Sequence, residues 1–193
     1  MSYTKIENYT NYDDYLEHQT SKNFSLDKTQ LYKKYNYRVE KFIKRLAHLN
    51  PFGECLVLGA RQGCELDAFK KLGATATGID LVPMSDKVLA CDFHHLFFLD
   101  STFDLVYSNS LDHSNMPEVF FNEACRVLKV GGRLVIDYAR LIGKWEAIEF
   151  KNPTTDIPEL LPKNMKLLDI KTDLPNIYKG KHTEWQFAWS KTL

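Results

Sequence analysis

The chain has 193 residues, which is long enough to bury one substantial core, so we expect a single domain over residues 1–193. Its 25 basic and 25 acidic residues cancel, which argues against a nucleic-acid partner or an anionic membrane surface. No apolar run approaches the roughly 18 residues of a membrane span, and the polar N-terminus lacks a signal-peptide layout, so we expect a cytoplasmic protein. The four cysteines form no C-x-x-C pair, so neither zinc nor disulfides are expected.

Residues 1–50 form an N-terminal arm followed by a helix. Residues 1–24 are polar and rich in tyrosine, without a clear period, and two interpretations stay open: a frayed tail, or an arm that folds over the mouth of a pocket. From Ser25 the apolar residues recur at helical spacing, and Pro51 and Gly53 end the helix. One face of this helix carries Leu31, Tyr35, Val39, Phe42, Ile43, Leu46 and Leu49.

The stretch from Cys55 to Asp80 predicts strand, glycine loop, helix and strand. The apolar run 56–58 breaks at Gly59 into a loop that Gly63 closes. Apolar residues 66, 69 and 72 then give one face of a helix, which Gly73 ends. The run 75–79 ends at Asp80. The spacing of 17 residues from Gly63 to Asp80 is close to the roughly 20 expected for an acid that accepts ribose hydroxyls. This pattern indicates a nucleoside cofactor.

The loop chemistry distinguishes between cofactors. A parallel strand ends at the carboxyl edge of the sheet, so the loop N–H groups and the next helix N-terminus point at a ligand there. Dinucleotide-binding proteins keep a glycine in the middle of this loop so that a pyrophosphate can touch the backbone, whereas this chain has Arg61. S-adenosylmethionine has no phosphate and does not need that glycine. Taken by themselves, these residues also fit an ordinary turn between a strand and a helix, with an acid on the surface after it.

The rest of the chain continues the alternation of strands and helices. Residues 88–91 and 103–107 predict two buried strands, ending at Asp92 and at Ser108-Asn109-Ser110. A helix over 117–128 is closed by a turn at residues 131–132, and 134–136 form a fifth strand. Residues 165–172 and 183–190 alternate like two strands of a hairpin joined across 179–181.

Over about residues 54–138 the chain resembles the class I S-adenosylmethionine-dependent methyltransferases, closest to the type 11 group. The motifs that carry the resemblance read, in order, LVLGARQG, GID, ACDFHHLFF, FDLVYSNSLDH and RVLKVGGRL. The resemblance implies an α/β fold: a single Rossmann-like, doubly wound sheet of seven strands, mostly parallel, with an antiparallel C-terminal edge pair. Residues 54–138 would form the cofactor-binding core, and 139–193 the substrate-side segment and the last strands.

The resemblance also implies roles for single residues. Asp80 would accept both ribose hydroxyls, Asp92 would take the adenine amino group with the Phe93 backbone nearby, and Asn109 would lie under the sulfonium. The family's usual acid two residues before the first glycine is replaced by Val57. Glu65 either holds the cofactor's amino group instead or only begins its helix. The full predicted cofactor set is Gly59, Arg61, Gly63, Glu65, Asp80, Asp92, Phe93 and Asn109.

The resemblance implies methyl transfer to an oxygen or nitrogen, and elimination of other substrate classes favours a small-molecule acceptor. An acceptor that begins protonated needs a base, and His113, next to Asp112, is the candidate, with a surface-loop histidine as the alternative. The fourth motif reads SNSL rather than N-P-P-Y, which argues against a DNA substrate. Two other functions stay open: a non-catalytic methyltransferase-like protein that binds the cofactor or a partner, and a nicotinamide-dependent dehydrogenase. No metal is expected.

Overall fold

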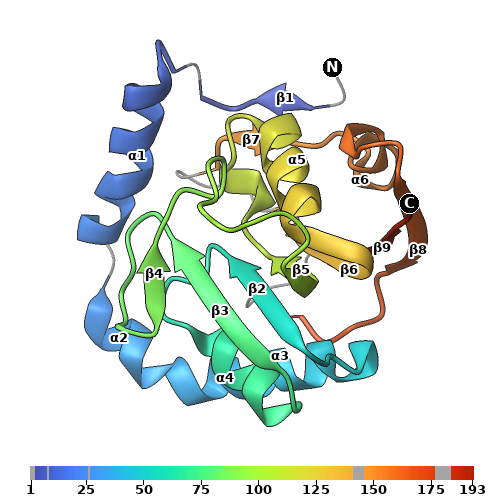
Figure 1. The fold of residues 1–193 in the computed structure, drawn as a ribbon. Helices are drawn as coiled ribbons and strands as arrows, with labels where there is room; N and C mark the ends of the chain where they lie inside the picture. The colour runs from blue at the N-terminus through green and yellow to red at the C-terminus, as the bar shows by residue number, and fades with distance from the viewer. Residues whose placement is uncertain (1–2, 8, 26, 141–145, 177–183) are drawn as a thin grey trace.

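A computed structural model describes residues 3–7, 9–25, 27–140, 146–176 and 184–193. Its main sheet has seven strands in the order β4-β3-β2-β5-β6-β9-β8 (Figure 1). The first five are parallel and β9 pairs antiparallel with both β6 and β8, as predicted. The strands are β2 (Glu54–Leu58), β3 (Thr75–Asp80), β4 (Val88–Ala90), β5 (Phe103–Ser108), β6 (Leu128–Ala139), β8 (Met165–Lys171) and β9 (Glu184–Lys191). The expected hairpin turn at 179–181 lies outside the described residues.

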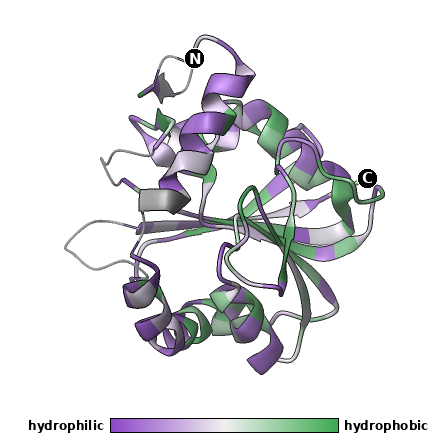
Figure 2. Cartoon of the chain, turned by 90° about the vertical axis from the view of Figure 1, so that its left-hand side faces the viewer, coloured by the Kyte–Doolittle hydropathy of each residue, from purple (hydrophilic) through white to green (hydrophobic). Residues whose placement is uncertain are grey.

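Helices cover both faces of the sheet (Figure 2), which explains why the central strands β2 and β5 are buried almost throughout. On one face, Cys55 and Val57 of β2 pack with α3 (Tyr35–Leu46) and α4 (Cys64–Lys71). On the other face, Leu56 and Leu58 pack with α5 (Pro117–Val127). Alternate residues of one strand therefore enter two separate cores.

The predicted helix from Ser25 to Leu49 is in fact divided. The structure has α2 (Lys28–Lys33), α3, and a 3₁₀ turn at Ala47–Leu49. The Asp27 side chain caps α2 by accepting a hydrogen bond from the Gln30 N–H at 3.1 Å. Because α2 buries none of its residues, nothing in the core requires it to continue in line with α3.

The N-terminal segment is an arm. It contains β1 (Thr4–Lys5), which pairs with β7 (Ile148–Glu149), and the helix α1 (Tyr12–Ser25). In Figure 1, α1 stands beyond the arrowhead of β3, at the carboxyl edge of the sheet. The sequence did not predict this helix because its residues are mostly polar and show no apolar stripe.

The glycine pair at 131–132 does not form a free turn after the helix. The strand β6 begins at Leu128, directly after α5, and includes both glycines. Its register against β5 shifts between the pairs Phe103–Leu128 and Leu105–Arg133, so the glycines lie in a bulge. The positive φ of +80° at Gly131 suits that irregular backbone.

A buried ion network ties α3 to the sheet. The Nε of Arg45 donates to Asp137 at 2.9 Å, and its Nη1 lies 3.0 Å from Glu184. Tyr107 and Gln186 also donate to the Asp137 carboxylate, at 2.5 and 3.0 Å. Because Arg45 is wholly buried and Asp137 is only 4% exposed, this network fixes the position of α3 behind the cofactor-side loop.

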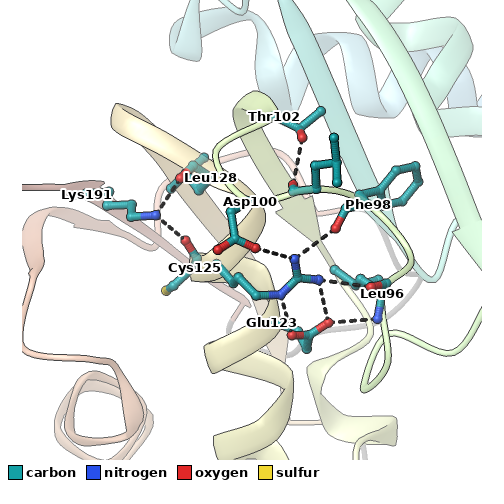
Figure 3. A network of polar contacts seen from close by, with 10 residues as sticks. Leu96, Phe98, Asp100, Thr102, Glu123, Cys125, Leu128 and Lys191 are labelled. Atoms are coloured by element: carbon teal, nitrogen blue, oxygen red, sulfur yellow. Dashed lines mark hydrogen bonds and ion pairs between the residues drawn. The ribbon is translucent and has the colours of Figure 1, made fainter.

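A second network fixes the loop that follows β4 (Figure 3). Arg126 of α5 donates to the carbonyls of Leu96 and Phe98 and pairs with Glu123 and Asp100. Glu123 in turn accepts the Leu96 N–H at 2.8 Å. This anchorage holds in place the loop that begins with Asp92. Three short elements complete the described chain: the 3₁₀ turn Leu111–His113 after β5, the helix α6 (Pro153–Asp156) and the 3₁₀ turn Pro158–Leu160.

Candidate functional site

A cleft lies at the carboxyl edge of the sheet, where the ends of four parallel strands meet α1. It has two adjoining pockets, which share residues from the loop after β2, from the end of β5 and from α1. The first, here the Asp80 pocket, is lined by Tyr15, Gln19, Lys22, Gly59, Arg61, Asp80, Leu81, Val82, Asp92, Phe93, Ser110 and His113. The second, here the Glu65 pocket, is lined by Lys22, Arg38, Gly59, Ala60, Arg61, Gln62, Cys64, Glu65, Asn109, Ser110, Asp112, His113 and Glu146.

The glycine loop after β2 contributes Gly59 and Arg61 to the cleft. Gly59 has a φ of +80°, and a Cβ on it would lie 2.5 Å from the Ser110 Oγ, so only glycine fits between the two strand ends. Arg61 is also in the left-handed region, with a φ of +43°, which costs a non-glycine residue about 1 kcal/mol. Gly63 lines neither pocket; its φ of +79° begins α4.

The Asp80 carboxylate is oriented by the backbone around it. Its Oδ2 accepts the Arg61 N–H at 3.0 Å, and its Oδ1 accepts the Val82 N–H at 2.9 Å. Burial raises the pKa of Asp80, against the opposing effect of these hydrogen bonds and of the Arg61 charge. Each oxygen keeps a free lone pair, so the carboxylate can still accept the two hydroxyls of a ribose.

Asp92 faces the same pocket but already has partners. Tyr12 of α1 donates its hydroxyl to Oδ2, and the backbone N–H and ring Nδ1 of His94 lie 2.8 and 2.9 Å from Oδ1. Burial acts to raise the pKa of Asp92, but the hydrogen bonds from His94 and Tyr12 outweigh it and leave the pKa below its ordinary value. His94 is held in turn by Ser114, at 2.7 Å from Nε2.

The comparisons with known proteins agree with this geometry. A family model described as "Methyltransferase domain" matches residues 56–136. The chain is a class I methyltransferase-fold protein. The match confirms the predicted resemblance to the S-adenosylmethionine-dependent methyltransferases, whose cofactor is S-adenosylmethionine. It also favours that cofactor over a nicotinamide. The comparison with curated proteins returned no match.

Solved structures share this fold at low sequence identity. One is the Burkholderia thailandensis 1,6-didemethyltoxoflavin-N1-methyltransferase with bound 1,6-didemethyltoxoflavin and S-adenosylhomocysteine (TM-score 0.72, 16% identity, 99% of this chain and 95% of that one). Another is a putative methyltransferase from Bacillus halodurans (0.59, 14%, 78% and 99%). A third is the [4+2]-cyclase SpnF (0.60, 16%, 78% and 81%). At these identities the likeness establishes the fold, which hosts more than one activity.

In this methyltransferase fold, α1 supplies one wall of the cleft. Tyr15, Gln19 and Lys22 follow one another at helical spacing and all line the Asp80 pocket. The Tyr15 side chain is 2% exposed, and its ring centroid lies 5.5 Å from that of His94. Sequence reasoning missed these residues, because the only available signal was a polar i, i+4, i+7 pattern, which is also typical of a solvated helix face.

Glu65 lies inside the second pocket rather than at a solvated helix start. It is 3% exposed and accepts a hydrogen bond from the Asn109 side chain at 3.3 Å. Burial raises the pKa of Glu65, and the nearby Arg38 guanidinium opposes that rise. Next to it, Gln62 is 2% exposed, and neither its amide nitrogen nor its amide oxygen has a hydrogen-bond partner among the described residues. Both polar groups suit the zwitterionic end of S-adenosylmethionine.

His113 lines both pockets, and its ring contacts α1 rather than its sequence neighbour. The Lys22 Nζ lies 2.7 Å from the His113 Nε2. Burial lowers the pKa of Lys22 to about 8, and the positive charge of Arg61 acts in the same direction. For Asp112, burial raises the pKa to about 6. The cleft therefore places the His113 ring beside a lysine whose pKa is lowered to about 8.

Within the described ranges, no group of three or more histidine, cysteine, aspartate or glutamate side chains is arranged to hold a metal ion. Among the same residues, no helix is both long and apolar enough to cross a bilayer. Cys55, Cys64, Cys91 and Cys125 are all free thiols.

Proposed function

We propose that this protein transfers the methyl group of S-adenosylmethionine to an oxygen or nitrogen of a small-molecule acceptor. The observation that carries the proposal is the Asp80 carboxylate, held at the end of β3 by the N–H groups of Arg61 and Val82 beside the Gly59 loop. A fixed carboxylate at this point of a parallel sheet is suited to recognising a ribose diol.

The two pockets divide the cofactor between them. Its adenosine half would occupy the Asp80 pocket, against Leu81, Val82 and Phe93. Its methionine half would occupy the Glu65 pocket, where Glu65 faces the amino group and Arg38 the carboxylate. The unpartnered amide of Gln62 supports this placement, because a polar ligand would satisfy it.

The cofactor supplies a methyl group on a cationic sulfur, so positioning provides much of the acceleration. The protein's own residues would align the acceptor and exclude water. His113 is placed to accept the proton of an acceptor O–H or N–H, and Lys22, at 2.7 Å from its Nε2, is placed to share that proton. Because Tyr15, Gln19 and Lys22 of α1 form one wall of the cleft, a small acceptor fits the space beside them. The neighbouring N1-methyltransferase, crystallised with the small molecule 1,6-didemethyltoxoflavin, supports that size class.

Calorimetric titration with S-adenosylmethionine, S-adenosylhomocysteine and NAD tests the proposal. We expect the first two to bind the wild type in the micromolar range, and Asp80→Ala to abolish their binding. Asp86→Ala, an exposed carboxylate on the loop after β3, serves as the control and should change nothing. Failure of both adenosyl compounds to bind the wild type would refute the proposal.

A second candidate function is cofactor or partner binding without turnover. The observation that favours it is the Tyr12 hydroxyl, which already occupies the carboxylate predicted to take the adenine amino group. One measurement distinguishes the two functions, a screen of small-molecule acceptors in the presence of S-adenosylmethionine. An active enzyme converts S-adenosylmethionine to S-adenosylhomocysteine with a suitable acceptor. A binding protein leaves S-adenosylmethionine unchanged with every acceptor.

A further inference from the structure

Gln62 is a buried amide at the edge of the Glu65 pocket. It belongs to the loop after β2, lines that pocket and is 2% exposed. Neither the nitrogen nor the oxygen of its amide has a hydrogen-bond partner in the part of the chain that the structure describes. A buried amide without a partner is costly, and native proteins keep few of them. A polar ligand in the pocket would offset that cost.

The backbone on both sides of Gln62 is held by hydrogen bonds. The Gly63 N–H donates to the Ala60 carbonyl at 2.7 Å, and the Arg61 carbonyl accepts the Met84 N–H at 2.9 Å. A shift of the loop that carried the amide to another partner would break these bonds. The Gln62 side chain is therefore preorganised beside the pocket, and a ligand that binds its amide does not have to order the loop first.

The strand position at which the family usually carries an acid has a different task in this chain. Val57 is wholly buried and belongs to the same apolar core as Val39 and Phe42 of α3. Polar groups in the Glu65 pocket come instead from the start of α4, where Gln62 and Glu65 stand three positions apart. The N-terminal end of this eight-residue helix carries a partial positive charge, which favours an anion beside the Gln62 amide.

We propose that Gln62 is a specificity-determining residue that selects the carboxylate at the amino-acid end of the cofactor. This inference rests on the proposed methyl transfer, because S-adenosylmethionine is the ligand that it concerns. The Gln62 amide nitrogen donates to that carboxylate, in the pocket that Arg38 also lines, while Glu65 accepts from the ammonium group. An adenosyl compound without the carboxylate leaves the buried amide unsatisfied, so the site discriminates against it.

Removal of this amide should change stability and affinity in opposite directions. Gln62→Met keeps a side chain of similar length and removes both polar atoms. In the unliganded protein it relieves the burial of an unpaired amide, so the Tm should rise by about 2 °C or more. Affinity for S-adenosylhomocysteine should fall about tenfold or more, because a hydrogen bond to a carboxylate is lost. A residue with only a structural role would lower both quantities together.

Calorimetric titration and thermal unfolding of the wild type, Gln62→Met and the control Gln30→Met test the assignment. Gln30 is an exposed residue of α2, and its substitution should change neither quantity. The ligands are S-adenosylhomocysteine, its decarboxylated analogue and 5′-methylthioadenosine, which lacks the whole amino-acid end. We expect Gln62→Met to weaken S-adenosylhomocysteine alone, since the other two ligands do not carry the carboxylate that the amide selects.

Three results would overturn the assignment while methyl transfer stands: an unchanged affinity of Gln62→Met for S-adenosylhomocysteine, an equal loss with the decarboxylated analogue, or a lower Tm of the unliganded variant. Should the wild type bind no adenosyl compound, methyl transfer fails, and titration with free L-methionine decides the role of Gln62 by itself. Binding of L-methionine that is lost in Gln62→Met supports the carboxylate site, and no binding by the wild type overturns it.

Discussion

The hydrogen bond from Tyr12 to Asp92 holds α1 against the core, so Tyr12→Phe should loosen the cover of the cleft. The substitution keeps the ring and its contacts with His94 and His95, and removes one hydroxyl donor to a carboxylate whose side chain is 17% exposed. Hydrogen bonds to charged groups contribute about 1.5–3 kcal/mol, and partial exposure of the pair favours the lower half of that range. About 1.5–2 kcal/mol corresponds to a roughly 10- to 30-fold rise in the detached population of α1.

Amide hydrogen exchange of α1 measures that population directly, and trypsin cleavage after Lys22 gives an independent rate. We expect both to increase about tenfold or more in Tyr12→Phe, with no change in exchange of β2 and β5. Tyr9→Phe is the matched control, since the Tyr9 hydroxyl contacts His18 of α1 itself at 2.8 Å. Unchanged exchange of α1 in Tyr12→Phe would show that the contact with Asp92 does not hold the helix.

Three further predictions concern binding and stability. Asp80→Asn should weaken S-adenosylhomocysteine about 10- to 100-fold by calorimetry, because the ribose hydroxyls lose a charged acceptor; an unchanged affinity contradicts ribose recognition there. Arg45→Met should lower the free energy of unfolding, measured by urea denaturation, by about 3–5 kcal/mol, since it leaves Asp137 charged and buried. A loss below about 1 kcal/mol would contradict this cost of an unpaired buried charge. Burial raises the pKa of Asp112 to about 6, so the folded state favours the protonated carboxyl. The stability that this preference contributes is complete below the ordinary pKa of 3.8 and is lost as the pH rises through about 6. Asp112→Asn should therefore gain stability relative to the wild type between about pH 4 and about pH 7, and a pH-independent difference contradicts that assignment.

One helix has two tasks in this molecule. Through Tyr12 it closes the cleft over Asp92, and through Lys22 it contacts His113 at 2.7 Å. In the proposed methyl transfer, access of the cofactor and the contact between Lys22 and His113 would both depend on the docked position of α1.

The sequence by itself determined the sheet and brought out the residues at the centre of the candidate cofactor site. Continuous apolar runs that end at a glycine or a single acid predict buried parallel strands. They do so because the spacing of apolar side chains and the polar residue at each strand end can be read from neighbouring residues in the sequence. The positions of Gly59, Asp80 and Asp92 followed from the same local pattern, and the structure brings all three to the Asp80 pocket.

Only the tertiary structure decided what covers the cleft and which charges meet inside it. The helix α1 has no apolar stripe, so its docking depends on contacts with residues 80 and 82 positions away in the chain, such as Tyr12 with Asp92 and His94. The His113 ring contacts Lys22 of α1, which is 91 residues away in the chain, whereas the sequence had offered Asp112 as its neighbour. Contacts between distant residues leave no period in the sequence, and for that reason the contact of Lys22 with His113 became visible only in the folded chain.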